Sequence, residues 1–142
     1  MKIVEENTIV IINGHDLTLD TFVAVARYGT KVQIAEEAIE AMTRSRALAE
    51  KISSEGRDFA SVAVPEDMSN QLSTNLILSH CTGTGDPYLE EEVRGMMLLR
   101  ANALCVGISG VRPILVKLLV EMLNSGVIPV IPQKGSLGAS GD

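Results

Sequence analysis

Hydrophobic and polar positions near the start of the chain predict a short strand followed by a helix. Residues 8–12 read Thr-Ile-Val-Ile-Ile, a β-branched run that stops at the turn dipeptide Asn-Gly of 13–14. We expect a short β hairpin there, with residues 2–4 as its other strand. Thr18 is placed to cap a helix that ends at Gly29, because threonine caps helix N-termini and glycine suits the left-handed position after a helix.

A longer helix is expected to follow, capped by Thr30 and running to about Ser53. Its apolar residues recur at helical spacing with charged residues on the opposite face. They are Val32, Ala35, Ile39, Met42, Leu48 and Ile52. Residues 54–65 contain a glycine, a proline and mixed polarity, which indicates a loop.

The second half of the chain predicts further helices. Residues 66–82 follow a helical pattern that stops at Gly83. Asp86-Pro87 then provides an N-cap and a first-turn proline for the next helix. The glutamates of 90–92 follow, where the dipole of a helix favours negative charge.

The most apolar segment, 95–106, is hydrophobic on nearly all sides. We therefore expect this helix to be buried on most faces, against neighbouring helices or another chain. Arg100 and Asn102 lie within it and need polar partners if they are buried. A last helix is expected to begin at Pro113 and to end at the Asn-Ser-Gly of 124–126.

These elements predict a mainly α fold with a little β structure near the N-terminus, and 142 residues form a single domain. The net charge of −6 argues against nucleic acid or an anionic membrane as the main partner. The N-terminus lacks the layout of a signal peptide and no apolar stretch is as long as a membrane span, so we expect a cytoplasmic protein. Cys81 and Cys105 are expected to be small buried side chains, and no Cys/His spacing suits a metal.

The last residues, 135–142, form a run of small side chains that can carry chemistry. In Ala139-Ser140-Gly141, a tight bend can bring the amide nitrogen of Gly141 onto the carbonyl carbon of Ala139 and close a five-membered ring. Loss of water from the ring and from Ser140 leaves an exocyclic methylene, an electrophile of a kind that no ordinary side chain provides. Taken alone, the triplet is more typical of a flexible tail. An anion-binding glycine loop is another interpretation, although the Gly-Lys-Ser/Thr ending of a P-loop is absent.

Other motifs give the triplet a context. They are Gln71-Leu72-x-x-Asn75-Leu76-Ile77-Leu78-Ser79-His80 with Gly83-x-Gly85, then Arg94-x-Met96-x-Leu98-x-Arg100-Ala101-Asn102-x-Leu104 with Gly107-x-Ser109-Gly110-Val111, and Ile128-Pro129-Val130-x-Pro132-x-Lys134-Gly135-Ser136. Together with Gly-Ala-Ser-Gly-Asp at 138–142, and in this order, they resemble the aromatic amino acid ammonia-lyases. The resemblance covers residues 1–142 almost entirely.

The resemblance implies a 4-methylidene-imidazole-5-one ring made from Ala139, Ser140 and Gly141, with no external cofactor and no metal. It also implies a mainly helical homotetramer whose active sites combine several subunits. In such enzymes the amine of an aromatic amino acid adds to the methylidene, a base removes a β-proton, and ammonia leaves.

The resemblance further assigns Asn75, Ser79 and His80 to substrate binding. A Ser-His pair at 79–80 is similar to the histidine-specific lyases, which form urocanate from L-histidine, whereas phenylalanine-type enzymes carry apolar residues there. A tyrosine-acting lyase or 2,3-aminomutase can also present a histidine, so these alternatives stay open, together with a phenylalanine ammonia-lyase. Asn75 and Ser79 share a helix face, and plain surface polarity is as good an interpretation as pocket lining.

The chain departs from the family in two respects. The family carries a Tyr-Gly-x-x-Thr-Gly-Phe-Gly loop with the catalytic tyrosine, but here Arg57 runs directly into Asp58, and the only tyrosines are Tyr28 and Tyr88. Because both flanks look intact, we favour a loop that is left out of this sequence over a protein that lacks it. The family's chains are also several times longer. We therefore interpret residues 1–142 as the N-terminal part of such a fold, truncated just after the triplet and inactive alone. A non-catalytic helical scaffold is the alternative from another functional class.

Overall fold

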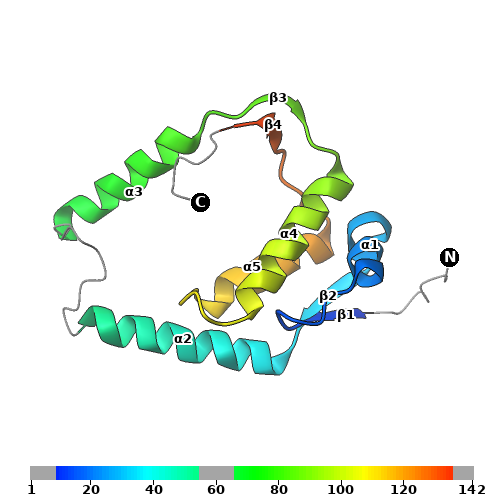
Figure 1. The fold of residues 1–142 in the computed structure, drawn as a ribbon. Helices are drawn as coiled ribbons and strands as arrows, with labels where there is room; N and C mark the ends of the chain where they lie inside the picture. The colour runs from blue at the N-terminus through cyan, green and yellow to red at the C-terminus, as the bar shows by residue number, and fades with distance from the viewer. Residues whose placement is uncertain (1–8, 55–65, 136–142) are drawn as a thin grey trace.

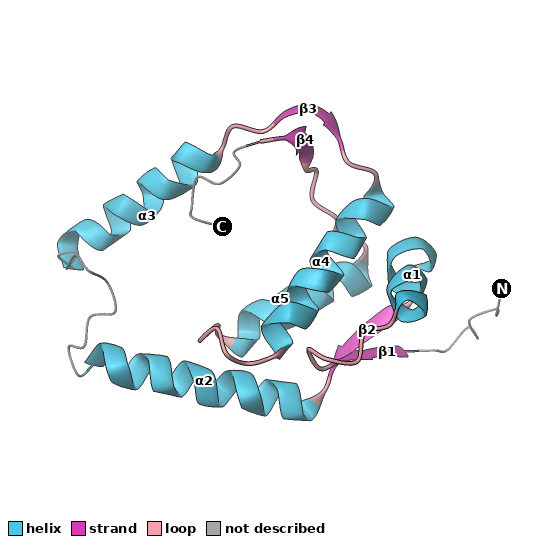
Figure 2. Cartoon of the chain, viewed as in Figure 1, coloured by secondary structure: helices cyan, strands magenta, loops and turns pink. Residues whose placement is uncertain are grey.

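The computed structural model describes residues 9–54 and 66–135, and this part of the chain is mainly helical (Figure 1). In chain order the elements are β1 (Ile9–Ile12), α1 (Leu19–Tyr28), β2 (Lys31–Ile34), α2 (Glu36–Ser54), α3 (Glu66–His80), β3 (Thr84–Pro87), α4 (Glu90–Cys105), α5 (Pro113–Ser125) and β4 (Pro132–Lys134). The mainly α fold that the sequence predicts is confirmed. Helices α4 and α5 lie side by side, with α1 packed against α4 and β2 against α5 (Figure 2).

Near the N-terminus the described chain forms a β-α-β unit. β1 pairs in parallel with β2, in a register that sets Val10 opposite Val32 and Ile12 opposite Ile34, and α1 crosses between the strands. These four side chains are buried in the core, and the residues that alternate with them are exposed. The hairpin expected with residues 2–4 falls outside the described residues. The pairing that the structure shows for β1 is parallel, which needs a crossover in place of a tight turn.

The prediction that Thr30 caps a helix is wrong. Residues 31–34 form β2, and α2 begins at Glu36. Buried side chains alternate with exposed ones along this strand, at Val32 and Ile34, which is the period of a strand. Val32 and Ala35, three residues apart, also fit a helical stripe, and the backbone pairing with β1 decides between the two periods.

The ends of α1 and α5 are those that the sequence predicts. The Thr21 N–H donates to the Thr18 hydroxyl at 3.3 Å, and the Thr18 N–H donates to the Thr21 hydroxyl at 3.0 Å, which is a reciprocal capping box. Gly29 follows α1 with φ 70, and Gly126 follows α5 with φ 72. Both are left-handed conformations that glycine adopts without steric cost. Pro113 opens α5 as expected.

The core lies where α1, α4, α5 and the β1–β2 pair meet. Its most deeply buried large side chains are Ile12, Met42, Leu98, Leu123, Val25, Val93, Val116 and Cys105. Helix α1 approaches α4 closely at Gly95, where an added Cβ would lie 2.8 Å from the ring of Phe22. That separation is shorter than van der Waals contact, so the glycine allows the two helices to pack at this distance.

Two polar side chains, Arg94 and Asn124, link the elements around this core by hydrogen bonds to backbone groups. Arg94 is 8% exposed and donates to the carbonyl of Val25 at 3.2 and 3.0 Å and to the carbonyl of Leu123 at 3.3 Å. Both carbonyls lie in the last turn of a helix, where the helix dipole favours a positive charge. The amide of Asn124 pairs with both backbone groups of Val32, at 2.8 Å each.

The prediction that Asp86-Pro87 begins a helix is also wrong, because these residues end strand β3. Helix α4 begins instead at Glu90, with acidic residues throughout its first turn as expected. The Leu89 N–H donates to Oε2 of Glu92 at 2.7 Å. A glutamate at the third position therefore satisfies the start of a helix that has no polar capping residue.

In the described structure, helix α4 is buried on one face, whereas the sequence predicts burial on most of its faces. The core-facing side carries Val93, Met97, Leu98, Ala101 and Cys105. The opposite side exposes Met96 and Leu99, by 39% and 52%. Arg100 is exposed, and Oδ1 of Asn102 accepts the Gly14 N–H at 3.0 Å, so neither polar side chain of the segment 95–106 is buried without a partner.

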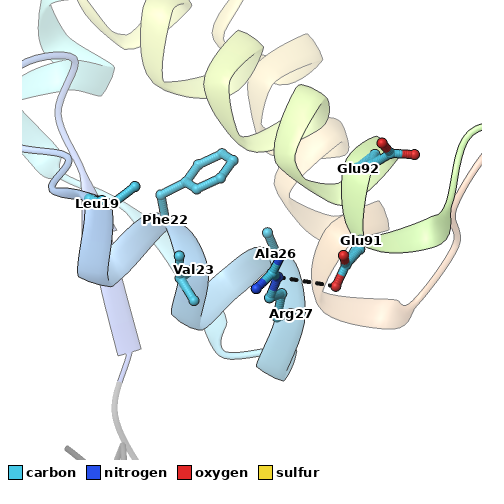
Figure 3. A pocket seen from close by; sticks show the side chains of 7 residues that line it. All are labelled: Leu19, Phe22, Val23, Ala26, Arg27, Glu91 and Glu92. Carbon is cyan, nitrogen blue, oxygen red and sulfur yellow. Dashed lines mark ion pairs between the residues drawn. The ribbon is translucent and has the colours of Figure 1, made fainter. Parts of the chain in front are cut away.

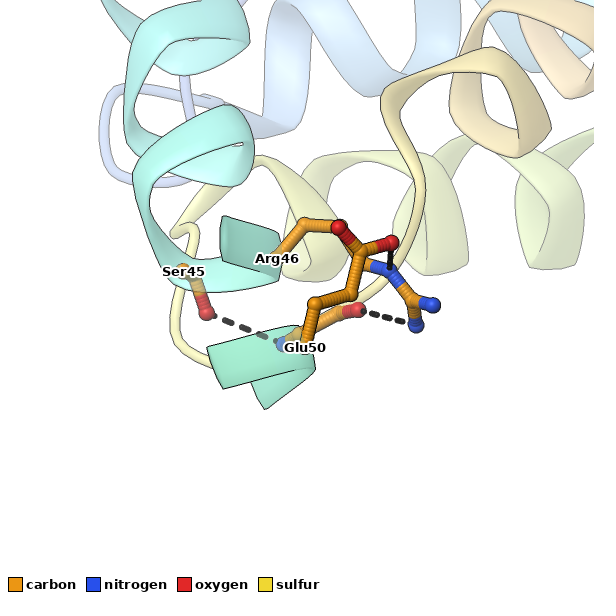
Figure 4. Close-up of polar contacts among 4 residues, drawn as sticks. Ser45, Arg46 and Glu50 are labelled. Atoms are coloured by element: carbon orange, nitrogen blue, oxygen red, sulfur yellow. Dashed lines mark hydrogen bonds and ion pairs between the residues drawn. The ribbon is translucent and has the colours of Figure 1, made fainter. Parts of the chain in front are cut away.

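The loop after α4 is fixed to α2 (Figure 4). The Gly110 N–H donates to Oγ of Ser45 at 3.0 Å, and the Gly110 carbonyl accepts from Nη1 of Arg46 at 3.4 Å. Nε of Arg46 donates to Glu50 at 2.6 Å, which orients the guanidinium. Gly107, with φ 75, lies so close to α2 that an added Cβ would be 2.6 Å from the Cβ of Ala41 in that helix.

Helix α3 lies apart from the core, beyond strands β3 and β4 (Figure 1). None of the other described elements packs extensively against it. Its large apolar side chains are accordingly exposed: Met68, Leu72, Leu76, Ile77 and Leu78. The helix predicted for residues 66–82 is confirmed to within two residues at its end.

Candidate functional site

Strands β3 and β4 join two of the sequence motifs. The strands are antiparallel, with Thr84 opposite Lys134 and Pro87 opposite Pro132, and Figure 2 shows them side by side. Immediately after β3, the Tyr88 N–H donates to the carbonyl of Ile131 at 2.9 Å. Because α3 leads into β3, and β4 leads into the glycine-rich run, this ladder links the end of α3 to the segment before the triplet.

The ladder depends on a close approach at Gly83. A Cβ on this residue would lie 2.8 Å from Cγ of Pro132, so any side chain would push the two strands apart. Gly85 has φ 85 and packs against the Lys134 side chain, next to an irregularity in the strand register. Both glycines of the Gly-x-Gly motif are therefore explained by backbone geometry.

His80 ends α3 and is held on one side only. Nδ1 of its ring lies 2.7 Å from the carbonyl oxygen of Leu76 and 3.0 Å from Oγ of Ser79. Oγ of Ser79 in turn donates to the same carbonyl at 2.8 Å. Nε2 of His80 is buried and has no hydrogen-bond partner within the described structure. A buried polar atom without a partner is uncommon.

The predicted site residues are thus brought together only in part. Ser79 and His80 contact each other, whereas Asn75 lies one turn earlier and accepts a hydrogen bond from Gln71 at 2.9 Å on an exposed face. Ala139, Ser140 and Gly141 lie outside the described residues. The Arg57–Asp58 junction, where the family resemblance predicts a tyrosine loop, also lies outside them.

The two cysteines differ in burial. Cys105 is 1% exposed, and burial raises the pKa of its thiol from 9.0 to about 11. Cys81 is exposed, so the expectation that both are buried is wrong for this residue. Among the described residues, no group of three or more His, Cys, Asp or Glu side chains could hold a metal ion. None of the described helices is long and apolar enough to cross a membrane.

A groove between α1 and α4 was not predicted from the sequence (Figure 3). It holds about 340 Å³ and is lined by Leu19, Phe22, Val23, Ala26, Arg27, Glu91 and Glu92. Nε of Arg27 and Oε2 of Glu91 form an ion pair across it at 3.2 Å. Both ends of this pair are well exposed, and the groove brings together no nucleophile and base.

The family model of the aromatic amino acid lyases matches residues 17–142 of the chain. The chain belongs to this family. Among curated relatives, histidine ammonia-lyase from Alkaliphilus metalliredigens is 46% identical over 94% of this chain, and that from Caldanaerobacter subterraneus is 45% identical over the same share. The chain spans 28% of the length of each.

Solved structures of the aromatic amino acid lyase family share the fold. Histidine ammonia-lyase from Trypanosoma cruzi matches with a TM-score of 0.81 and 34% identity, over 92% of this chain and 27% of that chain. Tyrosine aminomutase from Streptomyces globisporus matches with a TM-score of 0.82 and 32% identity, over the same shares. The family includes enzymes that act on different aromatic amino acids, so fold alone does not choose the substrate.

The alignment with the Alkaliphilus enzyme runs over 143 positions but takes in 94% of these 142 residues. Several positions of that relative therefore have no counterpart in this chain.

Proposed function

We propose that this chain is the N-terminal part of an enzyme that eliminates ammonia from L-histidine to give urocanate. The observation that carries the proposal is the β3–β4 ladder, which ties the segment after His80 to the segment that leads into Ala139-Ser140-Gly141. A substrate side-chain site and a reactive triplet are useful only when they are held close together. The histidine ammonia-lyases at 41–46% identity support histidine as the substrate.

The triplet fits a methylidene-imidazolone ring. Its three residues are those that the ring requires, and the strand before it is paired, so the run starts from a fixed stem at Lys134. When formed, the ring supplies an electrophile for the substrate amine. The part of the chain described by the structure contributes side-chain binding: Nε2 of His80 is free to bond to the imidazole of the substrate. In this role His80 distinguishes a polar aromatic ring from the phenyl ring of phenylalanine.

Two alternatives have specific support. A tyrosine ammonia-lyase or 2,3-aminomutase fits the same His80, because a phenol hydroxyl also reaches a ring nitrogen, and the Streptomyces globisporus aminomutase shares the fold. A non-catalytic helical scaffold is favoured by the absent tyrosine loop, because without that tyrosine the reaction has no base.

For the complete protein we further propose a cytoplasmic homotetramer that binds an aromatic amino acid and neither nucleic acid nor membrane. The exposed apolar side chains of α3 support assembly with further protein surface. The net charge of −6 disfavours polyanionic partners.

The test is a fusion of residues 1–142 to the downstream part of the Alkaliphilus metalliredigens enzyme, with that enzyme's tyrosine loop inserted between Arg57 and Asp58. We expect urocanate to form from L-histidine, measured by its absorbance, and no cinnamate to form from phenylalanine. Ser140→Ala in the same fusion is the matched control and should abolish turnover.

Other results would contradict the proposal. Coumarate or β-tyrosine from tyrosine, without urocanate from histidine, would establish the tyrosine-acting alternative. A folded tetrameric fusion that carries the ring and is inert to every aromatic amino acid would establish the scaffold.

A further inference from the structure

The end of α3 contains a compact triangle of polar atoms around one side of the His80 ring. Nδ1 of His80, Oγ of Ser79 and the carbonyl oxygen of Leu76 lie between 2.7 and 3.0 Å from one another. On the other side of the ring, Nε2 is buried without a partner in the described structure. The two nitrogens of one imidazole therefore have opposite environments.

This geometry determines where the ring proton lies. A carbonyl oxygen can only accept, so at 2.7 Å from Leu76 the Nδ1 atom must donate a hydrogen. A bare Nδ1 would face the carbonyl lone pairs. Oγ of Ser79 donates its own hydrogen to the same carbonyl and turns a lone pair toward Nδ1. Neutral imidazole has one N–H, so Nε2 is left as an acceptor.

We infer that Ser79 is a positioning residue that, with the Leu76 carbonyl, keeps the neutral His80 ring in its Nδ1–H tautomer. Nε2 then presents a lone pair at a buried position and takes a ligand that carries an N–H or O–H donor on its aromatic ring. The consequence for substrate choice rests on the proposed function, but the tautomer itself does not. Ser79 thus acts through His80, which differs from the direct substrate contact that the family resemblance implies.

The test is nitrogen NMR of the 142-residue chain. His15 and His80 are its only histidines, and exposed His15, whose ring makes no hydrogen bond in the described structure, serves as an internal reference. Long-range proton–nitrogen correlation spectra, recorded well above the pH range in which histidine titrates, identify the protonated nitrogen of each ring, and His15→Gln assigns the signals. We expect His80 to be protonated predominantly on Nδ1, and His15 to show the mixture typical of a ring in water.

Three variants separate positioning from a general effect on the helix. Ser79→Ala should shift His80 measurably toward the Nε2–H tautomer. Ser79→Thr keeps the hydroxyl and should leave the His80 spectrum as in the wild type. Ser73→Ala removes an exposed serine of the same helix and should change nothing. Far-UV circular dichroism shows whether each variant keeps the helical content of the parent.

Two results would overturn the inference. One is a wild-type His80 that is protonated on Nε2 or that matches the His15 mixture. The other is a Ser79→Ala variant with the wild-type tautomer. Neither depends on turnover, so a fusion enzyme that fails to release urocanate would remove the proposed function and leave the tautomer assignment standing.

Discussion

At the scale of single residues, Arg94 stands out because the hydrogen bonds of its buried charge within the described structure all go to backbone carbonyls. Arg94→Met keeps much of the aliphatic volume but removes both donors that the side chain gives to the carbonyl of Val25, and it leaves the carbonyl of Leu123 with the long bond from the Gly126 N–H at 3.4 Å. An unsatisfied buried polar group costs roughly 1–3 kcal/mol, so we expect the free energy of unfolding to fall by about 1–3 kcal/mol. Urea denaturation measures this change. Arg100→Met, on the exposed side of the same helix, should change stability by less than about 0.5 kcal/mol. Equal losses in both variants would contradict the role of Arg94.

The cysteines allow a second residue-scale prediction. Because burial raises the pKa of the Cys105 thiol to about 11, this side chain stays protonated and unreactive near pH 8 in the folded chain. Exposed Cys81 should be alkylated by iodoacetamide, and Cys105 only after denaturation, which mass spectrometry of the digested protein distinguishes. The raised folded pKa also means that Cys105 contributes stability below about pH 9 that is lost as the pH rises toward 11. Cys105→Ala should therefore flatten the pH dependence of stability over this window, whereas Cys81→Ala should not. Rapid alkylation of Cys105 in the native state would be inconsistent with its burial.

At the scale of elements, the sequence predicts helices better than strands. Capping residues bound α1 and α5 locally, so Thr18, Gly29, Pro113 and Gly126 could be identified without a structure. Strands β2, β3 and β4 have three or four residues each and are decided by partners distant in sequence. Within β3, Asp-Pro is a good helix start by local rules, but pairing with β4 overrides it. These strands could not be predicted from local sequence patterns, because they depend on hydrogen bonds between residues far apart in the sequence.

The same distinction holds for the candidate site. Ser79 and His80 are adjacent in sequence, so a motif could place them together. Their hydrogen bonds to the Leu76 carbonyl, and the pairing of Asn75 with Gln71, depend on rotamers that no pattern reports. The contact between Gly83 and the ring of Pro132 was likewise invisible, because a glycine motif shows that space is needed but not which residue fills it.

The ladder itself can be tested at this scale. Gly83→Ala sets a Cβ 2.8 Å from Cγ of Pro132, so we expect β3 and β4 to separate at a cost of about 1–3 kcal/mol. Hydrogen exchange of the Tyr88 amide, which donates to the Ile131 carbonyl, should become faster by at least tenfold. Gly135→Ala is the matched control, because this glycine flanks the same Thr84–Lys134 pair as Gly83 but has nothing within 4 Å of the position of an added Cβ. Unchanged protection of Tyr88 in Gly83→Ala would show that the strands tolerate the added methyl group.

At the scale of the whole molecule, apolar surface is distributed unevenly. The side chains of α4 and α5 that face the core are buried. In α3, by contrast, Leu76, Ile77 and Leu78 are 54%, 65% and 65% exposed. One further face of α5 exposes Ile114, Leu115 and Leu118. Such surface is typical of protein that is covered by other protein. Since this chain spans 28% of the length of its curated relatives, the apolar faces of α3 and α5 fit packing against the remainder of a longer fold.

The isolated chain also lacks the downstream part of the fold that would surround the triplet, and this affects ring formation. Ring closure needs the backbone at Ala139-Ser140-Gly141 to be compressed, and a stem at Lys134 on one side of the triplet supplies only part of that constraint. We expect the intact mass of the isolated 142-residue chain to equal that of the unmodified sequence. The fusion to the downstream part of the Alkaliphilus metalliredigens enzyme should instead lose the mass of two waters, and its Ser140→Ala variant should not. Loss of two waters from the isolated chain would show that these residues alone fold tightly enough to close the ring, and that the rest of the enzyme is needed for substrate and base rather than for making the electrophile.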